Sequence, residues 1–377
     1  MKGLFWVSVA AIVYTYAGYP VWLWLRARLR PRLVQRSSYL PSVSVVMVIH
    51  NEEKALAPKL DNLFSLNYQK ERIEIIVVSD GSTDRSEEIL HVYARDSRLR
   101  SLCFPECRGK AACLNDAIAA ARAELVVFTD VRQAIEKDAI QFLAENFADP
   151  AVGCVSGELM LGDPGSGEAS QGTGLYWRIE KMIRDLESSS GSVVGATGAL
   201  YAARRNLLPS VPAGTILDDV FIPMSVVRRG HRVLFDGRAR AWDHPNLGGR
   251  REFDRKVRTL SGNYQLVQLA PWLLGNTNPL RFEFVSHKLM RLAAPFALAL
   301  ALVSSALIQE TFYRAAAITQ LVFYLVALLE RPLVHAGPLG RIAGAAWTFV
   351  VLNAAALVAF TNFVTGRKPV WNTGDVQ

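Results

Sequence analysis

The acidic turn at residues 80–84 is the part of this sequence that most directly suggests a ligand site. It reads Asp-Gly-Ser-Thr-Asp and follows the apolar run Ile-Glu-Ile-Ile-Val-Val-Ser at residues 73–79. Such a run predicts a buried parallel strand, and open α/β sheets bind ligands at the carboxyl ends of these strands. Asp80 is therefore a candidate ligand contact. The alternative is a structural turn in which Ser82 or Asp84 caps the helix that begins near Arg85.

Further charged or polar side chains follow the predicted elements in a fixed order along the chain. They are Asn51 and Glu52, Lys110, Asp130 and Arg132, the pair Asp218 and Asp219, and finally Arg255 and Arg258. Two of these sites have a structural alternative. Lys110 could be a solvated lysine that opens a helix, and the aspartate pair could cap the helix that follows it. The order of the whole set is more specific than any one motif.

Strands and helices alternate in the part of the chain that must position these residues. The patterns predict strands at 43–49, 73–79 and 125–129, and helices at 52–66, 84–93 and 110–123. This alternation predicts an α/β domain with a mostly parallel central sheet. We place the domain at residues 41–265. A run of Gly, Asp, Pro and Ser predicts a flexible loop at residues 162–167.

Apolar segments of membrane length lie at both ends of the chain. Residues 3–25 are long enough to cross a hydrocarbon core, and five arginines follow within eleven residues. The positive-inside rule places that basic flank, and hence the α/β domain, in the cytoplasm. A cleaved signal peptide is the alternative for this first segment, but only Lys2 precedes it, whereas a signal peptide carries its charges there.

Three later apolar stretches, at residues 292–308, 312–329 and 342–365, predict three more crossings. We therefore expect an anchor at 1–25, an interfacial amphipathic segment at 266–291, about three membrane helices at 292–365 and a tail at 366–377. Four crossings place Arg331 and Arg341 in the cytoplasm, as the charge rule requires. They place Arg367 and Lys368 outside, against that rule.

The composition bears on the class of partner. The formal net charge is +8, but no nucleic-acid motif accompanies the basic residues. Anionic lipid headgroups and diphosphate substrates explain them better, and we expect membrane lipids but no nucleic acid as partners. The four cysteines lie in the predicted cytoplasmic part and should be reduced thiols. None of them forms a CxxC pair, which argues against zinc.

The ordered set resembles the processive, membrane-bound branch of family 2 glycosyltransferases, which includes cellulose, chitin-oligosaccharide, hyaluronan and poly-N-acetylglucosamine synthases. The resemblance covers roughly residues 41–263. One N-terminal and three C-terminal membrane segments are most similar to the chitin-oligosaccharide synthases. The resemblance implies a GT-A fold whose first half binds a UDP-sugar. Asn51 and Glu52 would lie beside the nucleoside, Asp80 would hold its uracil or ribose, and Lys110 would approach the diphosphate.

The resemblance also implies the catalytic roles. Asp130 corresponds to the first Asp of the family's DxD element and would bind Mg²⁺ or Mn²⁺. Asp219, whose distance to an Arg-Gly pair matches that in cellulose synthases, would be the general base, and Asp218 would raise its pKa by like-charge repulsion. Arg255 and Arg258 occupy the QxxRW element, in which the second arginine would bind the leaving diphosphate.

Two elements depart from the family pattern. Arg132 replaces the second Asp of the DxD element, which puts the metal geometry in doubt. In the QxxRW element Arg255 replaces Gln and Thr259 replaces Trp, which puts acceptor identity and processivity in doubt. Trp177 or Trp242 could supply a sugar platform instead, although an aromatic side chain in such a place is more often part of the core.

The leading hypothesis is an inverting transfer from a UDP-sugar to a growing glycan, with a β linkage, in exopolysaccharide synthesis and export at the cytoplasmic membrane. A second hypothesis is the transfer of one sugar to a lipid-linked acceptor such as a polyprenyl phosphate. A third is an inactive membrane scaffold in a polysaccharide secretion complex, whose subunits would then be partners. The sequence does not name the sugar, the linkage position or the primer.

Overall fold

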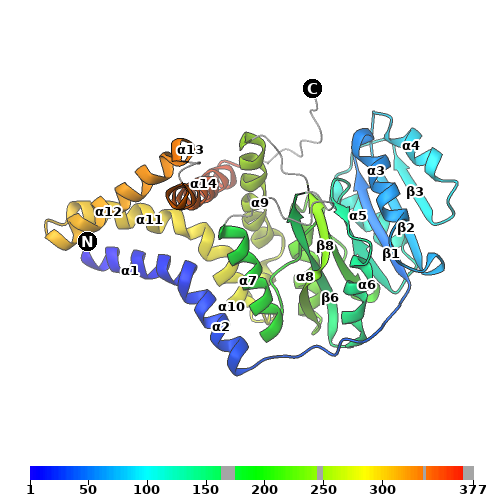
Figure 1. The fold of residues 1–377 in the computed structure, drawn as a ribbon, viewed down its shortest axis with the longest axis horizontal. Coiled ribbons are helices and arrows are strands. Elements are labelled where there is room, and N and C mark those ends of the chain that lie inside the picture. Colours follow the sequence, from blue (N-terminus) through cyan, green and yellow to red (C-terminus); the bar gives the residue numbers. More distant parts are fainter. Residues whose placement is uncertain (163–174, 244–248, 334–336, 368–377) are drawn as a thin grey trace.

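The computed structural model describes residues 1–162, 175–243, 249–333 and 337–367. Figure 1 shows an α/β domain joined to a group of long helices that extends away from it. The domain is built on one sheet, whose strands are β1 (Val43–Ile49), β2 (Ile73–Asp80), β3 (Leu99–Phe104), β4 (Leu125–Phe128), β5 (Ala134–Ile135), β6 (Val152–Leu161), β7 (Tyr201–Arg204) and β8 (Arg232–Asp243).

The order of the strands in the sheet is β3-β2-β1-β4-β7-β6-β8-β5. The first four strands are mutually parallel, and Val46 of β1 pairs with Ile76 of β2 on one side and Phe128 of β4 on the other. Strand β7 runs antiparallel to β4 and β6, β6 and β8 are parallel, and β5 is antiparallel to β8. The mostly parallel arrangement that the sequence predicted holds for the first half, and the second half is mixed.

Helices cover both faces of this sheet. They are α3 (Glu53–Phe64), α4 (Ser86–Tyr93), α5 (Lys110–Ala120), α6 (Ala139–Glu145), α7 (Leu175–Ser190), α8 (Asp218–Arg228) and α9 (Gly249–Leu269). One core lies between the sheet and α3 and α6, and the other between the sheet and α5 and α8. Each fully buried Val or Ile of β1 and β2 contributes roughly 1.5–3 kcal/mol by leaving water. Burial of the unbroken Val and Ile runs therefore fixes the central strands.

The second of these cores continues beyond the sheet. It includes Leu266 in the last turn of α9, Ala270 and Leu273 just after α9, and Phe284 at the start of the next long helix, packed with Phe221 and other residues of α8. Side chains next to the membrane helices and side chains of the α/β domain thus share one apolar core. A shared core holds the two parts in a defined relation, because separating them would expose its apolar surface.

Four helical segments are long and apolar enough to cross a membrane: Lys2–Leu29, Arg281–Leu307, Thr311–Leu328 and Pro338–Val364. This agrees with the count from the sequence. The first comprises α1 (Lys2–Val13) and α2 (Tyr19–Leu29), joined by a π-helical turn, and the second comprises α10 (Arg281–Phe284) and α11 (Met290–Leu307), joined in the same way. The others are α12 (Thr311–Leu328) and α14 (Pro338–Val364), with the short α13 (Glu330–Leu333) between them. Residues 281–291, expected to belong to a separate interfacial segment, are continuous with α11.

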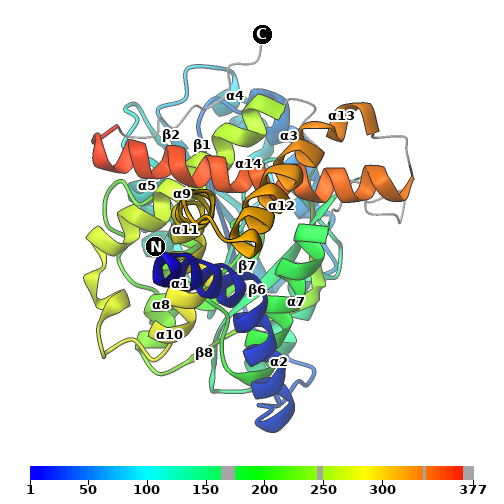
Figure 2. The ribbon, with the colours of Figure 1, turned by 90° about the vertical axis from the view of Figure 1, so that its left-hand side faces the viewer.

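The last of these helices does not run alongside the others. Figure 1 shows α11 along its length and α14 end-on, whereas Figure 2, turned by 90°, shows α14 along its length and α11 end-on. The two helices touch through the rings of Phe296 and Phe360, whose centroids are 4.9 Å apart. Helix α14 therefore crosses α11 steeply.

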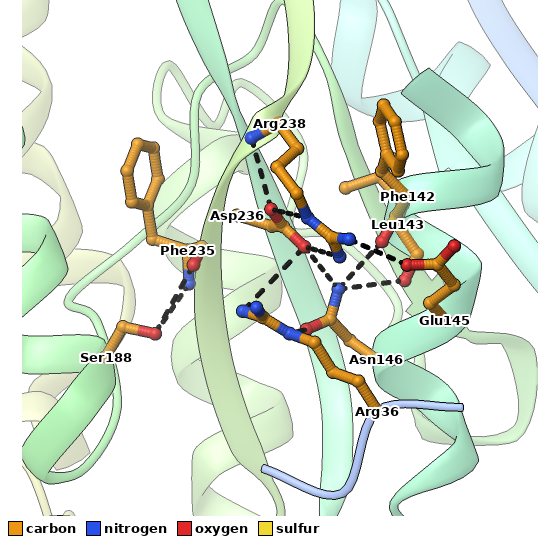
Figure 3. Close-up of polar contacts among 9 residues, drawn as sticks. All are labelled: Arg36, Phe142, Leu143, Glu145, Asn146, Ser188, Phe235, Asp236 and Arg238. Carbon is orange, nitrogen blue, oxygen red and sulfur yellow. Dashed lines mark hydrogen bonds and ion pairs between the residues drawn. The ribbon is translucent and has the colours of Figure 1, made fainter. Parts of the chain in front are cut away.

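A buried polar cluster attaches the linker after α2 to the far end of the sheet. Asp236 of β8 accepts hydrogen bonds from Asn146 Nδ2 (2.8 Å) and from the guanidinium of Arg238 (2.7 Å), and Arg36 lies 3.8 Å away (Figure 3). Burial alone would raise the pKa of Asp236, but these hydrogen bonds outweigh it and hold the pKa below its usual range. Ser188 of α7 hydrogen-bonds the backbone of Phe235 in the same strand. These contacts fix the linker and α7 against β8.

Candidate active site

Three neighbouring strands end at one edge of the sheet, and each is followed by a predicted site residue. Strands β2, β1 and β4 lie side by side and run parallel. Asp80 ends β2, Asn51 follows β1 by two residues, and Asp130 follows β4 by two residues. The carboxyl ends of parallel strands are where α/β sheets bind ligands. The fold thus brings together the residues that the sequence placed near a nucleotide.

Asp80 is buried at this edge, with 1% of its surface exposed. Its Oδ1 accepts the N–H of Arg108 (2.7 Å), and its Oδ2 accepts the N–H of Gly109 (2.9 Å). Burial would raise the pKa of Asp80, but these hydrogen bonds lower it below the usual value. The side chain is turned toward the loop before Lys110 and not toward the open edge. The carboxylate therefore fixes that loop, and its contact with a nucleotide stays a prediction.

Replacing Asp80 with Asn should weaken donor binding. An amide group offers one acceptor oxygen in place of two, so one buried backbone N–H loses its partner at a cost of about 1–3 kcal/mol. The loop that carries Lys110 should loosen, and we expect the donor KM to rise about tenfold with a smaller change in kcat. Asp61→Asn, an exposed change on α3, is the control. An unchanged donor KM in a folded Asp80→Asn protein would contradict this role.

Asn51 and Glu52 are the residues predicted to contact the nucleoside, and they link the end of β1 to the end of β2. Asn51 has a φ of 53°, a left-handed conformation that asparagine tolerates better than most residues. Its Oδ1 accepts the N–H of Thr83 at 2.8 Å. Asp84 accepts the N–H of Ser86, the first residue of α4, at 3.0 Å. The capping alternative for the acidic turn thus applies to Asp84 and not to Asp80.

The carboxyl group of Glu52 lies in the field of the loop after β4. Burial raises its pKa above the usual value, and Asp84 and Asp130 add to this effect, whereas Arg132 opposes it. Arg132 itself is exposed. Glu52, Asp130 and Arg132 therefore act on one another at the open edge of the sheet, where a nucleotide and its phosphates would lie.

Lys110 sits between carboxylates from two distant segments. Its Nζ lies 3.2 Å from Asp130 Oδ1 and 3.2 Å from Asp218 Oδ1. Burial would lower the pKa of Lys110, but Asp130, Asp218 and Asp219 outweigh burial and raise it above its ordinary value. The alternative of a solvated lysine is wrong, because this ammonium group is half-buried and paired. It is a fixed positive charge at the centre of the site.

The fold raises the pKa of the Asp219 carboxyl group clearly above its ordinary value. It lies in the first turn of α8, and its Oδ2 accepts the N–H of Gly198 at 3.1 Å. Burial and the neighbouring Asp218 raise its pKa to about 6, while Lys110 and Lys288 act in the opposite direction. No side chain caps α8 at its N-terminus, which leaves both aspartates to the site. The repulsion from Asp218 that the resemblance implied is present in the geometry.

Gly198 forms the floor between Asp219 and Asp130. A Cβ atom placed on Gly198 would lie 3.4 Å from Asp130 Oδ2 and 3.5 Å from Asp219 Oδ2. The two carboxylates thus face a common space that is open because residue 198 has no side chain.

Few side chains at the site could coordinate a metal ion. Within the described residues no group of three or more His, Cys, Asp or Glu side chains could hold an ion. Asp130 is a half-exposed carboxylate beside the open space above Gly198. Mg²⁺ is usually bound by one or two carboxylates together with substrate phosphates. The arrangement therefore fits an ion whose other ligands come from a diphosphate, and the described cysteines form no disulfide and no zinc site.

The predicted diphosphate contacts on α9 are Arg255 and Arg258. Arg255 is exposed and has an Nη1 atom 3.8 Å from Asp243 Oδ2, and Arg258 is exposed as well. Their role at the leaving diphosphate stays a prediction.

Trp242 is buried and donates its indole N–H to Glu136 at 2.7 Å, so it belongs to the core. Trp177 is half-buried on α7.

Sequence reasoning missed two lysines near the site. Lys59 is 3% exposed on α3, and its Nζ donates to Thr129 Oγ1 (2.8 Å) and to the backbone oxygen of Gln133 (2.5 Å). Burial lowers its pKa to about 7, and the side chain supports the loop that carries Asp130. A signal was present, since Lys59 falls on the apolar helix face of Leu56, Leu60 and Leu63. Lys288, in the π-helical turn before α11, acts on Asp219 and had no comparable signal.

Comparisons with known proteins agree with this arrangement. A family model described as Glycosyl transferase family 2 matches residues 44–209. Poly-beta-1,6-N-acetyl-D-glucosamine synthase of Staphylococcus aureus (strain COL) is 25% identical over 234 residues, which make up 60% of this chain and 56% of that protein. The synthase of Staphylococcus epidermidis is 24% identical over 236 residues, with 61% and 56% covered. The match spans little more than half the length of these relatives.

A solved structure resembles the whole chain. It is a mannosyltransferase from Pyrobaculum calidifontis in complex with GDP-Man and Mn²⁺, which superposes with a TM-score of 0.75 and covers 97% of this chain and 99% of that one. The two sequences are 22% identical. This likeness shows the fold, which is the GT-A fold that the sequence predicted, with membrane-length helices at both ends.

Proposed function

We propose that this chain, which carries a family 2 glycosyltransferase domain, transfers a sugar from a nucleoside diphosphate sugar to a hydroxyl group of a membrane-associated glycan, with inversion at the anomeric carbon. The observation that carries the proposal is Asp219. It is a carboxylate with a pKa of about 6, held by the N–H of Gly198 and facing Asp130 across an open space. A base with a pKa near the working pH suits this reaction.

Asp219 acts as the general base in this proposal. The acceptor hydroxyl group hydrogen-bonds to Asp219, its oxygen attacks the anomeric carbon, and its proton passes to the carboxylate. The bond between the anomeric carbon and the diphosphate oxygen breaks at the same time, and its electron pair leaves with the nucleoside diphosphate. One displacement on an α-linked donor gives a β-linked product.

The donor would lie along the edge formed by β2, β1 and β4. Its diphosphate would approach Lys110, whose ammonium group already lies 3.2 Å from Asp130. Asp130 would hold Mg²⁺ or Mn²⁺, and the bound ion would offset the negative charge of the diphosphate. Arg132, at the position of the second carboxylate of the usual motif, would add a second positive charge. The mannosyltransferase with the same fold was solved with GDP-Man and Mn²⁺, which supports such a donor and ion.

A UDP-sugar is the donor class we propose, with extension of an exopolysaccharide as the outcome. The curated relatives make a polymer of N-acetyl-D-glucosamine, which favours this donor. The reaction would take place at the cytoplasmic face of the cytoplasmic membrane, since Arg26, Arg28 and Arg30 follow the first apolar helix directly. Export of the product past the membrane helices is part of the same proposal.

The rate should depend on pH through Asp219. A base with a pKa of about 6 is increasingly protonated below that pH, so kcat/KM should fall about tenfold per pH unit on the acid side. The measurement is the initial rate of nucleotide release from pH 4.5 to 8, with donor binding followed over the same range. An acid limb near pH 4 would identify an ordinary exposed carboxylate as the base and would contradict this assignment.

Nucleotide release also tests the donor. The purified protein in detergent or lipid nanodiscs should release nucleotide from one of UDP-glucose, UDP-N-acetylglucosamine, UDP-galactose and GDP-mannose, and more of it with Mn²⁺ than with a chelator. Release from GDP-mannose alone would contradict the UDP-sugar proposal while leaving the transferase proposal intact. Release from none of the four donors would contradict both.

One cavity favours a second candidate, the transfer of a single sugar to a lipid-linked acceptor. The cavity has a volume of about 250 Å³ and lies among α7, α9, α14 and the membrane helices, lined by Tyr16, Tyr176, Leu260, Arg291 and the 344–356 part of α14. It is smaller than the roughly 300–1,000 Å³ typical of small-molecule sites. It therefore fits a segment of an apolar chain better than a nucleotide sugar.

The cavity adjoins the helix that acts on the base. Arg291 lines it, and three residues earlier on the same helix Lys288 acts electrostatically on Asp219. A lipid whose chain lay in the cavity could place its polar end near Lys288 and the base. Product analysis separates the candidates: a single sugar on extracted lipid would support this one, and long glycan chains would support the first.

A further inference from the structure

A histidine of the membrane-associated helix is enclosed between two buried carboxylates. His287, in the π-helical turn that joins α10 and α11, is 2% exposed, and Glu180 and Glu187 of α7 are 8% and 0% exposed. His287 Nδ1 lies 2.8 Å from Glu187 Oε1, and its Nε2 lies 3.1 Å from Glu180 Oε1. Both ring nitrogens thus face carboxylate oxygens.

This geometry determines the charge of the ring. A neutral imidazole has one N–H donor and one acceptor nitrogen, and an ionised carboxylate only accepts. Burial would raise the pKa values of Glu180 and Glu187, but Arg291 and His287 beside Glu180, and His287 and Tyr19 beside Glu187, lower them below the usual value. Arg291 also donates to Glu180 and Tyr19 also donates to Glu187, as they would to ionised carboxylates, and His287 can donate to both carboxylates only as an imidazolium with two N–H groups.

The groups that surround this ring come from three elements. They are Tyr19 of α2, Glu180, Arg184 and Glu187 of α7, and Lys288 and Arg291 of the helix that carries His287. Arg291 Nη1 donates to Glu180 Oε2 at 2.7 Å. The positive charge on His287 therefore lies among carboxylates and cations that compensate one another, and its loss would remove one hydrogen-bond donor from Glu180 or from Glu187.

Glu187 connects the membrane helices to the floor of the active site. Its Oε1 accepts the hydroxyl group of Tyr19 at 2.6 Å in addition to His287, and its Oε2 accepts the backbone N–H of Val194 at 3.2 Å. Four residues after Val194, Gly198 donates its N–H to Asp219 at 3.1 Å. The N–H of Ala196 also bonds the backbone oxygen of Asp219, at 2.7 Å. A short stretch of backbone thus links the Glu187 carboxylate to the proposed base.

We propose that His287, as an imidazolium held between Glu180 and Glu187, is a positioning residue that couples the membrane helices to Asp219. The proposal rests on the function proposed above, in which Asp219 is the base. The proton on His287 keeps Glu187 directed at both α2 and Val194, and the loop from Val194 to Gly198 keeps Asp219 oriented. Without the two N–H donors of His287 the link fails, and turnover falls while donor binding remains.

The charge of the ring can be tested without activity. In ¹⁵N NMR of the purified protein in nanodiscs, the side chain of His287, assigned by its loss in His287→Asn, should show two protonated ring nitrogens at neutral pH. One protonated and one unprotonated nitrogen would overturn the proposal. His91, which is exposed on α4, provides an internal comparison with a solvated ring.

The coupling is tested by kinetics. His287→Asn should lower kcat about tenfold, because a small displacement of a catalytic group is costly, and should leave the donor KM within about twofold. Tyr19→Phe, which removes one donor to Glu187 and little volume, should lower kcat in the same way by a smaller factor. His91→Asn is the matched control. Nucleotide release from the donor that the screen identifies is the assay.

The outcomes separate this inference from the proposed function. If Asp219→Asn is inactive while His287→Asn and Tyr19→Phe both keep the wild-type kcat, the coupling is wrong and the base remains. If Asp219→Asn keeps wild-type turnover, the proposed function fails first. If His287→Asn is poorly folded, Tyr19→Phe decides: an unchanged kcat in that variant overturns the coupling.

Discussion

Replacing Asp219 with Asn should lower kcat about a thousandfold, within the range of roughly 10²–10⁴ that a positioned general base contributes. The amide group keeps the size of the side chain, and its oxygen can still accept the N–H of Gly198, so the floor of the site should persist. What is lost is the group that takes the acceptor proton. Donor binding should change little, because the change lies on the acceptor side of the space above Gly198.

The measurement is nucleotide release by the purified protein, with the donor KM determined in parallel. Asp254→Asn, on the exposed face of α9, is a matched control with the same chemical change outside the site. Equal turnover by wild type and Asp219→Asn would remove Asp219 from its proposed role. Absence of turnover in the wild type as well would favour the scaffold hypothesis, in which the chain serves a secretion complex without catalysis.

Replacing Lys110 with Met should have the second largest effect. The ammonium group lies 3.2 Å from both Asp130 and Asp218, and the loss of one preorganised charge at a leaving group typically costs about 10²–10³ in kcat. We expect a loss of about a hundredfold. Lys110 also lowers the pKa of Asp219, so its removal should shift the acid limb of the pH profile upward.

The shift of the acid limb distinguishes this role from simple damage. A protein that is only partly folded would lose rate equally at all pH values, whereas the loss of Lys110 should be greater at low pH than at high pH. Lys54→Met, an exposed lysine on α3, is the control. A normal kcat with an unmoved acid limb in Lys110→Met would show that the ammonium group touches neither the leaving group nor the base.

The central strands and the candidate residues could be predicted because their signals are local. The run from Val43 to Ile49 forms β1 with the predicted bounds, since an unbroken apolar run has few other places in a soluble domain. Asp130 and Asp219 were found from their order along the chain. Strands β6 and β8, in contrast, pair across a long separation in sequence, and no local pattern specifies such a pairing.

The errors at the site have a similar cause. The position of Asp80 at a strand end was predicted correctly, but its hydrogen bonds to the backbone of Arg108 and Gly109 were not, because those residues belong to another segment. The cluster around His287 could not be recognised from the sequence, because the partners of His287 are about a hundred residues away in sequence. Residues that act through long-range contacts leave no spacing pattern to recognise.

The steep crossing of α11 by α14 affects how many times the chain can cross the membrane. If α11 crosses the bilayer along its normal, α14 lies within one leaflet and does not span the bilayer. The four apolar helices therefore set an upper limit on the number of crossings. With three crossings, Arg331, Arg341 and Arg367 all lie on the side of the α/β domain. The positive-inside rule, which four crossings violate at Arg367, would then hold at both ends of α14. The chain would then cross the membrane an odd number of times, and its two ends would lie in different compartments.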